Sequence, residues 1–429
     1  MALAKSRCLF SLSRLLIQGG RALEGVVSTG GSKNSALPII TAAALAGSGE
    51  SIIENVPNYT DVLDLCEILR QLGTKVELLG EGRLRVDGRG LDNHVAPYHL
   101  ARRLRASSYL VGLLLARLGR AEVAVPGGCN IGLRPVDYHI KGFAALGAEV
   151  AVERGSIVGS AGRLRGSRIY IARASFGTTV NMLIAASLAE GTTVLENPAQ
   201  EPEVVDLANF LNRMGARVRG AGTNQIRVDG VSALTGTHHE VIPDRLEAGT
   251  YLIAGAITGG TVRVENVIPE HLRTVLAKLR EAGAEVFNRA DAVEVRAPAR
   301  LRAVDIETHP HPGFPTDLQP PFLSLECLAE GVAVIRETIF ENRFAFTDEL
   351  VRMGAGIKVE RETAIVRGVA RLTGAPTEAA DIRGGAALVL AGLAAEGETE
   401  VGGLEHIDRG YDRLEERLAE LGARLRRLP

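Results

Sequence analysis

One short motif recurs six times along this chain at nearly constant spacing. It is a glycine that follows Leu, Met or Ala and usually precedes Ala, and its glycines are Gly73, Gly147, Gly215, Gly283, Gly354 and Gly422. The intervals between them are 74, 68, 68, 71 and 68 residues. Each copy follows a helical pattern, such as Leu63–Leu72, and most precede an alternating strand pattern. We therefore expect each glycine to end a helix in the left-handed conformation and to turn the chain into a strand.

A second marker keeps the same phase. A glycine followed by a β-rich run precedes each helix, at Gly49, Gly119, Gly191, Gly260, Gly331 and Gly397. Two independent markers in phase indicate a repeated unit of about 70 residues, with room for two helices and about four strands. Six such units exceed the usual size of one domain, so we expect two domains of three units each. The segment 230–243, between the third and fourth units, contains turn residues and is expected to cross between the domains.

Composition narrows the class of protein. The 49 basic and 51 acidic residues leave a formal net charge of −2, which argues against a nucleic-acid-binding surface. The four cysteines lie far apart without a CxxC pair, so we expect neither a disulfide framework nor a zinc site, and a reducing, cytoplasmic location fits. The longest apolar runs, Ala36–Ala46 and Gly384–Ala395, are shorter than the ~20 residues of a membrane span. We interpret residues 1–11 as a short extension or a misassigned start rather than a signal peptide.

The polar residues that stand out occur once each rather than in every unit. Cys129 lies in PGGCNIGLRP, between glycines and five residues before Arg134. A nearby guanidinium favours the thiolate and can hold an anionic substrate beside it. The alternative is a small apolar cysteine in a loop without a chemical role.

Other segments carry further candidate charged groups. Lys33 in GGSKNSALP opens an apolar helix, where free N–H groups and a lysine together suit an anion, although a solvated turn lysine is the alternative. Asp317 in FPTDLQ is either a helix cap or a general base for a hydroxyl. The remaining candidate cations are Arg105, Arg134, Arg343, Arg383 and Arg409, the last three at expected strand-to-helix junctions, where clefts form in α/β layers. Loop cations in a near-neutral protein favour small phosphate and carboxylate ligands.

The motifs GSKNSALP, RAS, PGGCNIGLRPVD, FPTDLQ, FENRF and HIDRGY, in that order, resemble those of the enolpyruvyl transferases over residues 12–429. The resemblance implies an α/β fold of two inside-out α/β barrel domains, each of three repeats. It implies one domain at residues 33–241, which carries the Cys129 loop as a lid. The second domain would comprise residues 12–32 and 242–429, and the cleft between the two would close on substrate.

The resemblance also implies a reaction. The enolpyruvyl group of phosphoenolpyruvate would pass to the 3′-hydroxyl of UDP-N-acetylglucosamine with release of phosphate, by addition and then elimination, as the first committed step of peptidoglycan synthesis. Cys129 would protonate the methylene carbon, would be able to carry a covalent pyruvyl adduct and would be the target of fosfomycin. Asp317 would take the hydroxyl proton. The resemblance implies no metal, no organic cofactor and no nucleic-acid or membrane partner, and the oligomeric state stays open.

Binding roles follow from the same resemblance. Phosphoenolpyruvate would be held by Lys33, Asn34, Arg134 and Arg409, of which Lys33 and Arg409 would also be catalytic. UDP-N-acetylglucosamine would contact Arg105, Pro135, Val136, Asp137, Tyr138, Ser175, Phe176, Gly177, Asp317 and Ile339, with Arg343 and Arg383 in support. Two alternatives are a sister transferase acting on shikimate 3-phosphate and a silent paralogue that only binds nucleotide sugar. The Cys loop disfavours the first, and the presence of both Lys33 and Asp317 disfavours the second.

Overall fold

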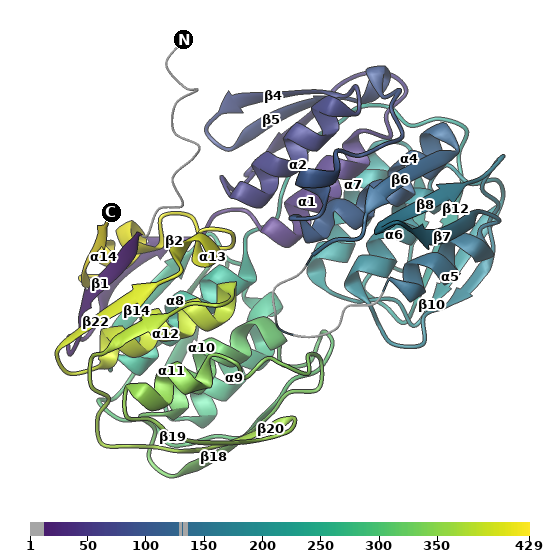
Figure 1. The fold of residues 1–429 in the computed structure, drawn as a ribbon. Coiled ribbons are helices and arrows are strands. Elements are labelled where there is room, and N and C mark those ends of the chain that lie inside the picture. Colours follow the sequence, from purple (N-terminus) through teal and green to yellow (C-terminus); the bar gives the residue numbers. More distant parts are fainter. Residues whose placement is uncertain (1–12, 128–130, 132–135) are drawn as a thin grey trace.

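A computed structural model of the chain describes residues 13–127, 131 and 136–429. Two hydrophobic cores divide these residues: one is built from residues 36–241, the other from residues 15–27 together with 246–421. Figure 1 shows the corresponding two lobes, with β1 and β2 from the start of the chain lying in the lobe that is otherwise green and yellow. We call the lobes the N-terminal and the C-terminal domain.

The N-terminal domain contains three of the six sheets found in the described residues. In spatial order these are β13 (His238–Glu240), β3 (Ser51–Glu54), β5 (Arg83–Asp87) and β4 (Lys75–Gly80); β6 (Arg120–Ala124), β8 (Ser156–Ser160) and β7 (Glu149–Glu153); and β11 (Arg217–Arg219), β12 (Gln225–Asp229), β10 (Thr192–Glu196) and β9 (Arg168–Tyr170). Its helices are α1 (Lys33–Ala43), α2 (Thr60–Gln71), α3 (Tyr98–Ala101), α4 (Tyr109–Leu118), α5 (Asp137–Ala145), α6 (Phe176–Ala186) and α7 (Pro202–Arg213), with 3₁₀ turns η1 (Gly88–Gly90) and η2 (Arg105–Ser108).

The C-terminal domain repeats this plan with three further sheets. They are β15 (Glu285–Asn288), β16 (Ala292–Arg296), β14 (Thr261–Glu265) and β2 (Glu24–Ser28); β17 (Ile306–Glu307), β18 (Val332–Arg336), β20 (Thr363–Arg367) and β19 (Gly356–Glu360); and β21 (Pro376–Glu378), β22 (Glu398–Gly402), β1 (Arg14–Gln18) and β23 (Arg424–Leu428). Its helices are α8 (Arg245–Ile257), α9 (Arg273–Glu281), α10 (Gln319–Glu326), α11 (Thr347–Arg352), α12 (Ile382–Ala394), α13 (Leu404–Ile407) and α14 (Leu414–Glu420), with 3₁₀ turns η3 (Pro269–Leu272) and η4 (Thr316–Leu318).

The recurring glycines act as the sequence predicts. All six that follow the helical patterns have φ between +86° (Gly147) and +105° (Gly215 and Gly283). A side chain at these positions would strain the backbone, so glycine is the residue that lets each helix turn directly into the next strand. The expectation of six left-handed helix ends is therefore confirmed.

Three helices run through the interior of each domain: α1, α4 and α6 in the first, and α8, α10 and α12 in the second. They are buried on nearly all sides, and α8 is buried at every position. A helix that is apolar all round belongs in a core. The runs Ala36–Ala46 and Gly384–Ala395 fall largely on α1 and α12, and among the described residues no helix is long and apolar enough to cross a membrane.

The chain crosses between the domains at two segments, 29–33 and 241–245, which run side by side. The backbone N–H of Ser32 donates to the carbonyl of Ile242 (2.8 Å), and that of Asp244 donates to the carbonyl of Gly30 (2.9 Å). The chain crosses the first time because β1 and β2 belong to sheets of the C-terminal domain, whereas α1 belongs to the N-terminal domain. In these sheets Leu15 of β1 lies opposite Val401 of β22, and β2 runs parallel to β14. The second follows β13, which pairs with β3 before the chain leaves the N-terminal domain.

The contact between α4 and α6 gives a test of packing in the N-terminal core. A Cβ added at Gly112 would lie 2.7 Å from Oδ1 and 2.8 Å from the carbonyl oxygen of Asn181. We expect Gly112→Ala to lower the free energy of unfolding by about 2 kcal/mol, since overpacking outweighs the gain in helix propensity.

Urea unfolding followed by circular dichroism checks this prediction. Gly47→Ala is the matched control, because a Cβ at this exposed position meets no atom within 4 Å. Equal midpoints for Gly112→Ala and the unmodified protein would show that α4 and α6 can separate without cost.

Candidate functional site

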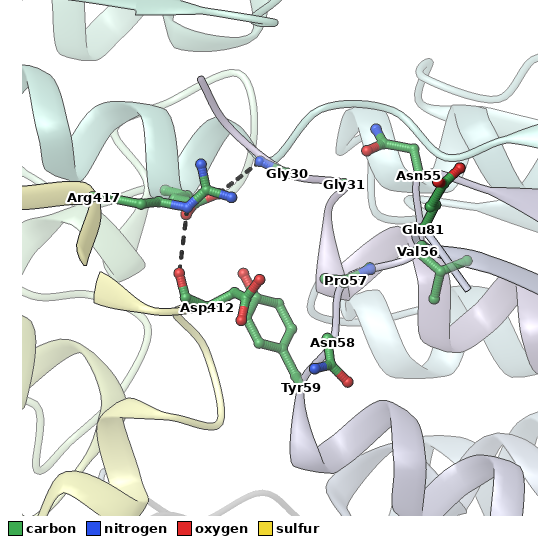
Figure 2. A pocket seen from close by; sticks show the side chains of 12 residues that line it. Gly30, Gly31, Asn55, Val56, Pro57, Asn58, Tyr59, Glu81, Asp412 and Arg417 are labelled. Atoms are coloured by element: carbon green, nitrogen blue, oxygen red, sulfur yellow. Dashed lines mark hydrogen bonds and ion pairs between the residues drawn. The ribbon is translucent and has the colours of Figure 1, made fainter. Parts of the chain in front are cut away.

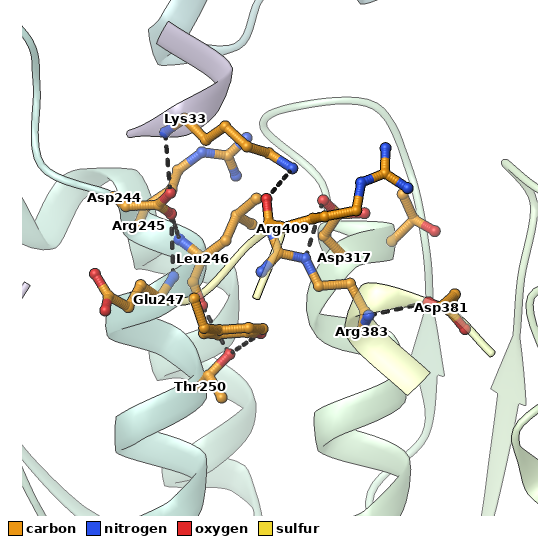
Figure 3. Close-up of polar contacts among 12 residues, drawn as sticks. Lys33, Asp244, Arg245, Leu246, Glu247, Thr250, Asp317, Asp381, Arg383 and Arg409 are labelled. Atoms are coloured by element: carbon orange, nitrogen blue, oxygen red, sulfur yellow. Dashed lines mark hydrogen bonds and ion pairs between the residues drawn. The ribbon is translucent and has the colours of Figure 1, made fainter. Parts of the chain in front are cut away.

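Lys33, Asp61 and Arg409 form a charged cluster where the two domains meet. Lys33 is the first residue of α1 and is only 7% exposed. Its Nζ lies 3.2 Å from Oδ2 of Asp61 and donates to the carbonyl of Arg409 at 2.9 Å, while Nε of Arg409 donates to Oδ1 of Asp61 at 3.0 Å. One carboxylate of the N-terminal domain thus holds a cation from each domain in a single group. Figure 3 shows the hydrogen bond from Lys33 to the carbonyl of Arg409.

A second charged cluster lies within the C-terminal domain. Asp317, in the 3₁₀ turn η4, faces two buried arginines. Nη2 of Arg343 donates to its Oδ1 at 2.9 Å, and Nε of Arg383 lies 3.4 Å from its Oδ2. The Asp317 side chain keeps 28% of its surface exposed, so the carboxylate is held in place and still reaches solvent. Such a group can accept a proton from a bound hydroxyl.

Helix caps set the positions of these residues. Asp381 is the N-cap of α12 and accepts from the backbone N–H groups of Arg383 (2.9 Å) and Gly384 (3.0 Å), which fixes Arg383 in the first turn. Asp244 is the N-cap of α8, and its other oxygen accepts from the backbone N–H of Lys33 at 3.3 Å. Burial works against the charge on Arg383, but Tyr411, Asp317 and Asp244 outweigh burial and raise the pKa of this guanidinium.

Seven of the candidate nucleotide-sugar residues, all except Pro135, Asp317 and Ile339, lie on the N-terminal domain. Ser175 caps α6 through the N–H of Thr178 (3.3 Å), and Phe176 and Gly177 form the first turn of that helix. Gly177 packs against the ring of His139 on α5, the helix whose first turn contains Asp137 and Tyr138 after Val136 as N-cap. Arg105 opens the 3₁₀ turn η2, which leads into α4.

The neutral side chain of His139 packs beneath these residues and links α5 to α6. Burial, assisted by Arg105, lowers the pKa of His139 to about 4, so its Nδ1 can accept from the side-chain N–H of Asn181 at 2.8 Å. Asn181 in turn donates to the carbonyl of Ser108 (2.8 Å) and accepts from the N–H of Gly112 (3.0 Å). The first turns of α5 and α6 are therefore tied to α4.

The domains also touch at the turn that follows β18. Nη2 of Arg173, from the N-terminal domain, donates to the carbonyls of Thr338 and Ile339, the latter at 3.1 Å. The N–H of Asn342 donates to the carbonyl of Ile131 at 3.0 Å. Ile339 therefore lies at a contact between the two domains.

Several sequence predictions stay untested. Cys129, Arg134 and Pro135 lie outside the described residues, as does the extension 1–11. Arg409 follows the short helix α13 rather than opening a helix after a strand, because Gly403 ends β22 in the left-handed conformation and α13 intervenes. The described parts of the chain contain no group of three His, Cys, Asp or Glu side chains that could hold a metal ion.

Sequence reasoning missed Asp61, Asp244 and Arg173. Asp61 stands in the first turn of α2, where an acidic residue is ordinarily read as a helix-dipole partner, and its ion pair joins residues 348 positions apart. Asp244 occurs in the segment expected to lead into a new domain, and the proline before it was its only local signal. The contacts of all three depend on the arrangement of two domains.

A small cavity of about 170 Å³ lies between the domains beside the first crossing segment, and Figure 2 shows the residues around it. Its lining includes Gly30, Tyr59, Glu247, Asp412 and Arg417. Oε2 of Glu247 accepts from the N–H of Gly30 at 3.0 Å, and Oε1 accepts from the hydroxyl of Tyr251 at 2.9 Å. None of the sequence-predicted site residues that the structure describes lines this cavity.

Comparison with known proteins identifies relatives across nearly the whole chain. The family model EPSP synthase (3-phosphoshikimate 1-carboxyvinyltransferase) matches residues 17–418. UDP-N-acetylglucosamine 1-carboxyvinyltransferase 2 of Symbiobacterium thermophilum is 64% identical, over 97% of this chain and 98% of the relative. UDP-N-acetylglucosamine 1-carboxyvinyltransferase 3 of Caldanaerobacter subterraneus is 51% identical, over 97% and 100%.

A solved structure extends the comparison to the fold. The enolpyruvyl transferase NikO from Streptomyces tendae has a TM-score of 0.88 and 29% sequence identity, over 97% of this chain and 98% of that one. The predicted fold class, two α/β domains of the enolpyruvyl transferase type, is thereby confirmed.

The buried carboxyl of Glu247 predicts a pH dependence of stability. Burial, and next the nearby Asp244, raise its pKa from 4.5 to about 7 although Arg417 opposes them. The folded protein therefore binds this proton more tightly than the unfolded chain, and the associated stability is lost as pH rises from 4.5 through 7. Since Gln cannot titrate, the unfolding free energy of Glu247→Gln minus that of the unmodified protein should increase by about 3 kcal/mol between pH 4.5 and pH 8.

Urea unfolding at a series of pH values measures this difference. Parallel curves for Glu247→Gln and the unmodified protein would contradict the raised pKa.

Proposed function

This chain belongs to the enolpyruvyl transferase family, and we propose that it transfers the enolpyruvyl group of phosphoenolpyruvate to the 3′-hydroxyl of UDP-N-acetylglucosamine, with release of phosphate. The observation that carries the proposal is the 64% identity to a relative named for this reaction, over 97% of the chain. This reaction is the first committed step of peptidoglycan synthesis. Both substrates are small molecules, and we assign their binding and the proton transfers of the reaction to side chains of the protein.

The charged cluster between the domains suits phosphoenolpyruvate. Lys33 and Arg409 are already held next to each other by Asp61, so an anion that binds there meets two oriented cations. We assign phosphoenolpyruvate to Lys33, Asn34 and Arg409, together with Arg134 from the segment outside the described residues. Because the two cations come from different domains, binding of the substrate depends on both.

The cluster in the C-terminal domain suits the acceptor hydroxyl. Asp317 takes the proton of the 3′-hydroxyl as the sugar oxygen adds to C2 of phosphoenolpyruvate, and an acid adds a proton to C3 in the same step. The tetrahedral ketal that results then loses a proton from C3 and releases phosphate, which restores the enol double bond. Arg343 and Arg383 hold Asp317 in its position throughout.

We assign the acid to Cys129, which is also the candidate for a covalent pyruvyl adduct. The nucleotide sugar is assigned to Arg105, Ser175–Gly177 and Ile339, and to the segment 135–138 of which residues 136–138 are described. In support, the first turns of α5 and α6 lie next to each other on the N-terminal domain, and Ile339 lies where that domain meets the C-terminal one.

The choice of acceptor is the direct test. The description of the family model names 3-phosphoshikimate as the acceptor, whereas the relatives at 51% and 64% identity are named for UDP-N-acetylglucosamine. We expect phosphate release from phosphoenolpyruvate in the presence of UDP-N-acetylglucosamine, with shikimate 3-phosphate at least 100-fold poorer in kcat/KM, because a site built for one set of polar groups leaves its own groups unpaired with another. Absence of release with the nucleotide sugar would remove the proposal.

The thiol gives a second test. Cys66 and Cys327 are fully buried, burial raises the pKa of the Cys66 thiol to about 11, and burial also raises the pKa of Cys327. Since the thiolate is the nucleophile, the epoxide antibiotic fosfomycin should alkylate Cys129 and leave both buried cysteines unmodified. Peptide mass mapping after incubation with UDP-N-acetylglucosamine and fosfomycin locates the adduct.

Two variants separate the acid role from the nucleophilic one. Cys129→Asp keeps a proton donor, so we expect it to retain turnover and to lose alkylation. Cys129→Ala should lower kcat by about 100-fold or more, the usual effect of removing a general acid. Equal loss of turnover in both variants would contradict proton donation by Cys129.

A further inference from the structure

One buried carboxylate outside both charged clusters accepts four hydrogen bonds. Glu337, at the end of β18, is 2% exposed. Its Oε1 accepts from Oγ1 of Thr308 at 3.0 Å, from the N–H of Ile339 at 2.8 Å and from the N–H of Phe340 at 3.2 Å. Its Oε2 accepts from Oγ1 of Thr316 at 3.0 Å. These donors satisfy the polar atoms of a side chain that burial removes from water.

The four donors belong to two separate segments. Thr308 and Thr316 bracket the loop that leads from β17 into η4, and Thr316 is the immediate neighbour of Asp317. Ile339 and Phe340 begin the turn that follows β18. The Glu337 carboxylate therefore joins the segment that contains the proposed base to the segment that contains a proposed nucleotide-sugar contact.

Each segment is held a second time by an arginine. Nη2 of Arg343 donates to the carbonyl of Thr316 at 3.2 Å as well as to Asp317, so Thr316 is fixed at its hydroxyl by Glu337 and at its carbonyl by Arg343. The Ile339 carbonyl accepts from Arg173 of the other domain, while its N–H is bound by Glu337. Glu337 is thus the link between a contact made by the N-terminal domain and the position of Asp317.

We propose that Glu337 is a positioning residue for the transfer reaction: its carboxylate sets the place of the Asp317 turn relative to the Ile339 turn, and so the place of the acceptor hydroxyl relative to its base. This inference rests on the proposed function, since it takes Asp317 as the base and Ile339 as a contact of the nucleotide sugar. Glu337 itself is buried and acts through these two neighbours.

The two oxygens of the carboxylate can be tested separately. Thr316→Val removes the hydroxyl on the Asp317 side and leaves the bonds to Ile339 and Phe340. We expect kcat to fall about tenfold, with KM for both substrates within twofold of the unmodified protein.

Thr308→Val removes the hydroxyl that donates to Oε1 and accepts from the N–H of Thr338 at 2.9 Å, on the Ile339 side. Here we expect KM for UDP-N-acetylglucosamine to rise about fivefold, with kcat within threefold.

A double-mutant cycle shows whether Thr316 acts through the base. Thr316→Val should cost nothing more when it is introduced into Asp317→Ala, with both proteins measured in single turnover. The same tenfold loss in that background would overturn the proposal, as would an effect of Thr316→Val on KM alone.

Conservative replacement of Glu337 adds a second criterion. Glu337→Gln keeps an accepting oxygen for the Ile339 turn, and its kcat should stay within about tenfold of the unmodified value. The kcat of Glu337→Ala should fall 100-fold or more.

Amide hydrogen exchange makes the test independent of turnover. Exchange should accelerate over residues 314–318 in Thr316→Val and over residues 337–343 in Thr308→Val, each without a change in the other segment. These patterns hold even if the unmodified protein proves to use another acceptor, which would count against the proposed function alone. Faster exchange without any kinetic cost, or no change in exchange, would overturn the positioning role of Glu337.

Discussion

The structure depends on the carboxylate of Asp244, which meets the N-termini of two helices in different domains. One oxygen caps α8 of the C-terminal domain through the N–H groups of Leu246 and Glu247, and the other accepts from the first N–H of α1, at Lys33. A carboxylate is favoured at a helix N-terminus by both hydrogen bonding and the helix dipole. Here one group satisfies two helices at once, at the place where the crossing segments pair. This arrangement fixes Lys33 at the place where the two domains meet.

The charged groups of the site are paired with each other. Asp61 holds Lys33 and Arg409, and Asp317 is held by Arg343 and Arg383. Because most of these side chains are largely buried, an unpaired charge there would carry a large desolvation cost. Each carboxylate holds two cationic side chains in fixed positions, so that an anion or hydroxyl that binds there meets a preorganised site.

The repeat architecture was accessible from the sequence, whereas the site was accessible only in part. The helix-ending glycines could be predicted because a left-handed residue leaves a local signal, and all six recur at one spacing. Lys33 and Asp317 could be chosen as candidates because each stands alone in an otherwise apolar or proline-rich segment. Asp61 and Glu337 could not, since an acidic residue at a helix start or a strand end is ordinary, and what distinguishes them is a set of partners brought together by the fold.

The pairing of β1 has a consequence for how the protein is made. Arg14 and Glu400, joined across β1 and β22, are separated by 386 residues. During synthesis the ribosome completes the N-terminal domain and most of the C-terminal domain before β22 and β23, the two partners of β1, have been made. Until then β1 lacks both partner strands, and unpaired strand edges promote aggregation. The sheet that contains β1 can therefore form only after the residues of β23 have been made.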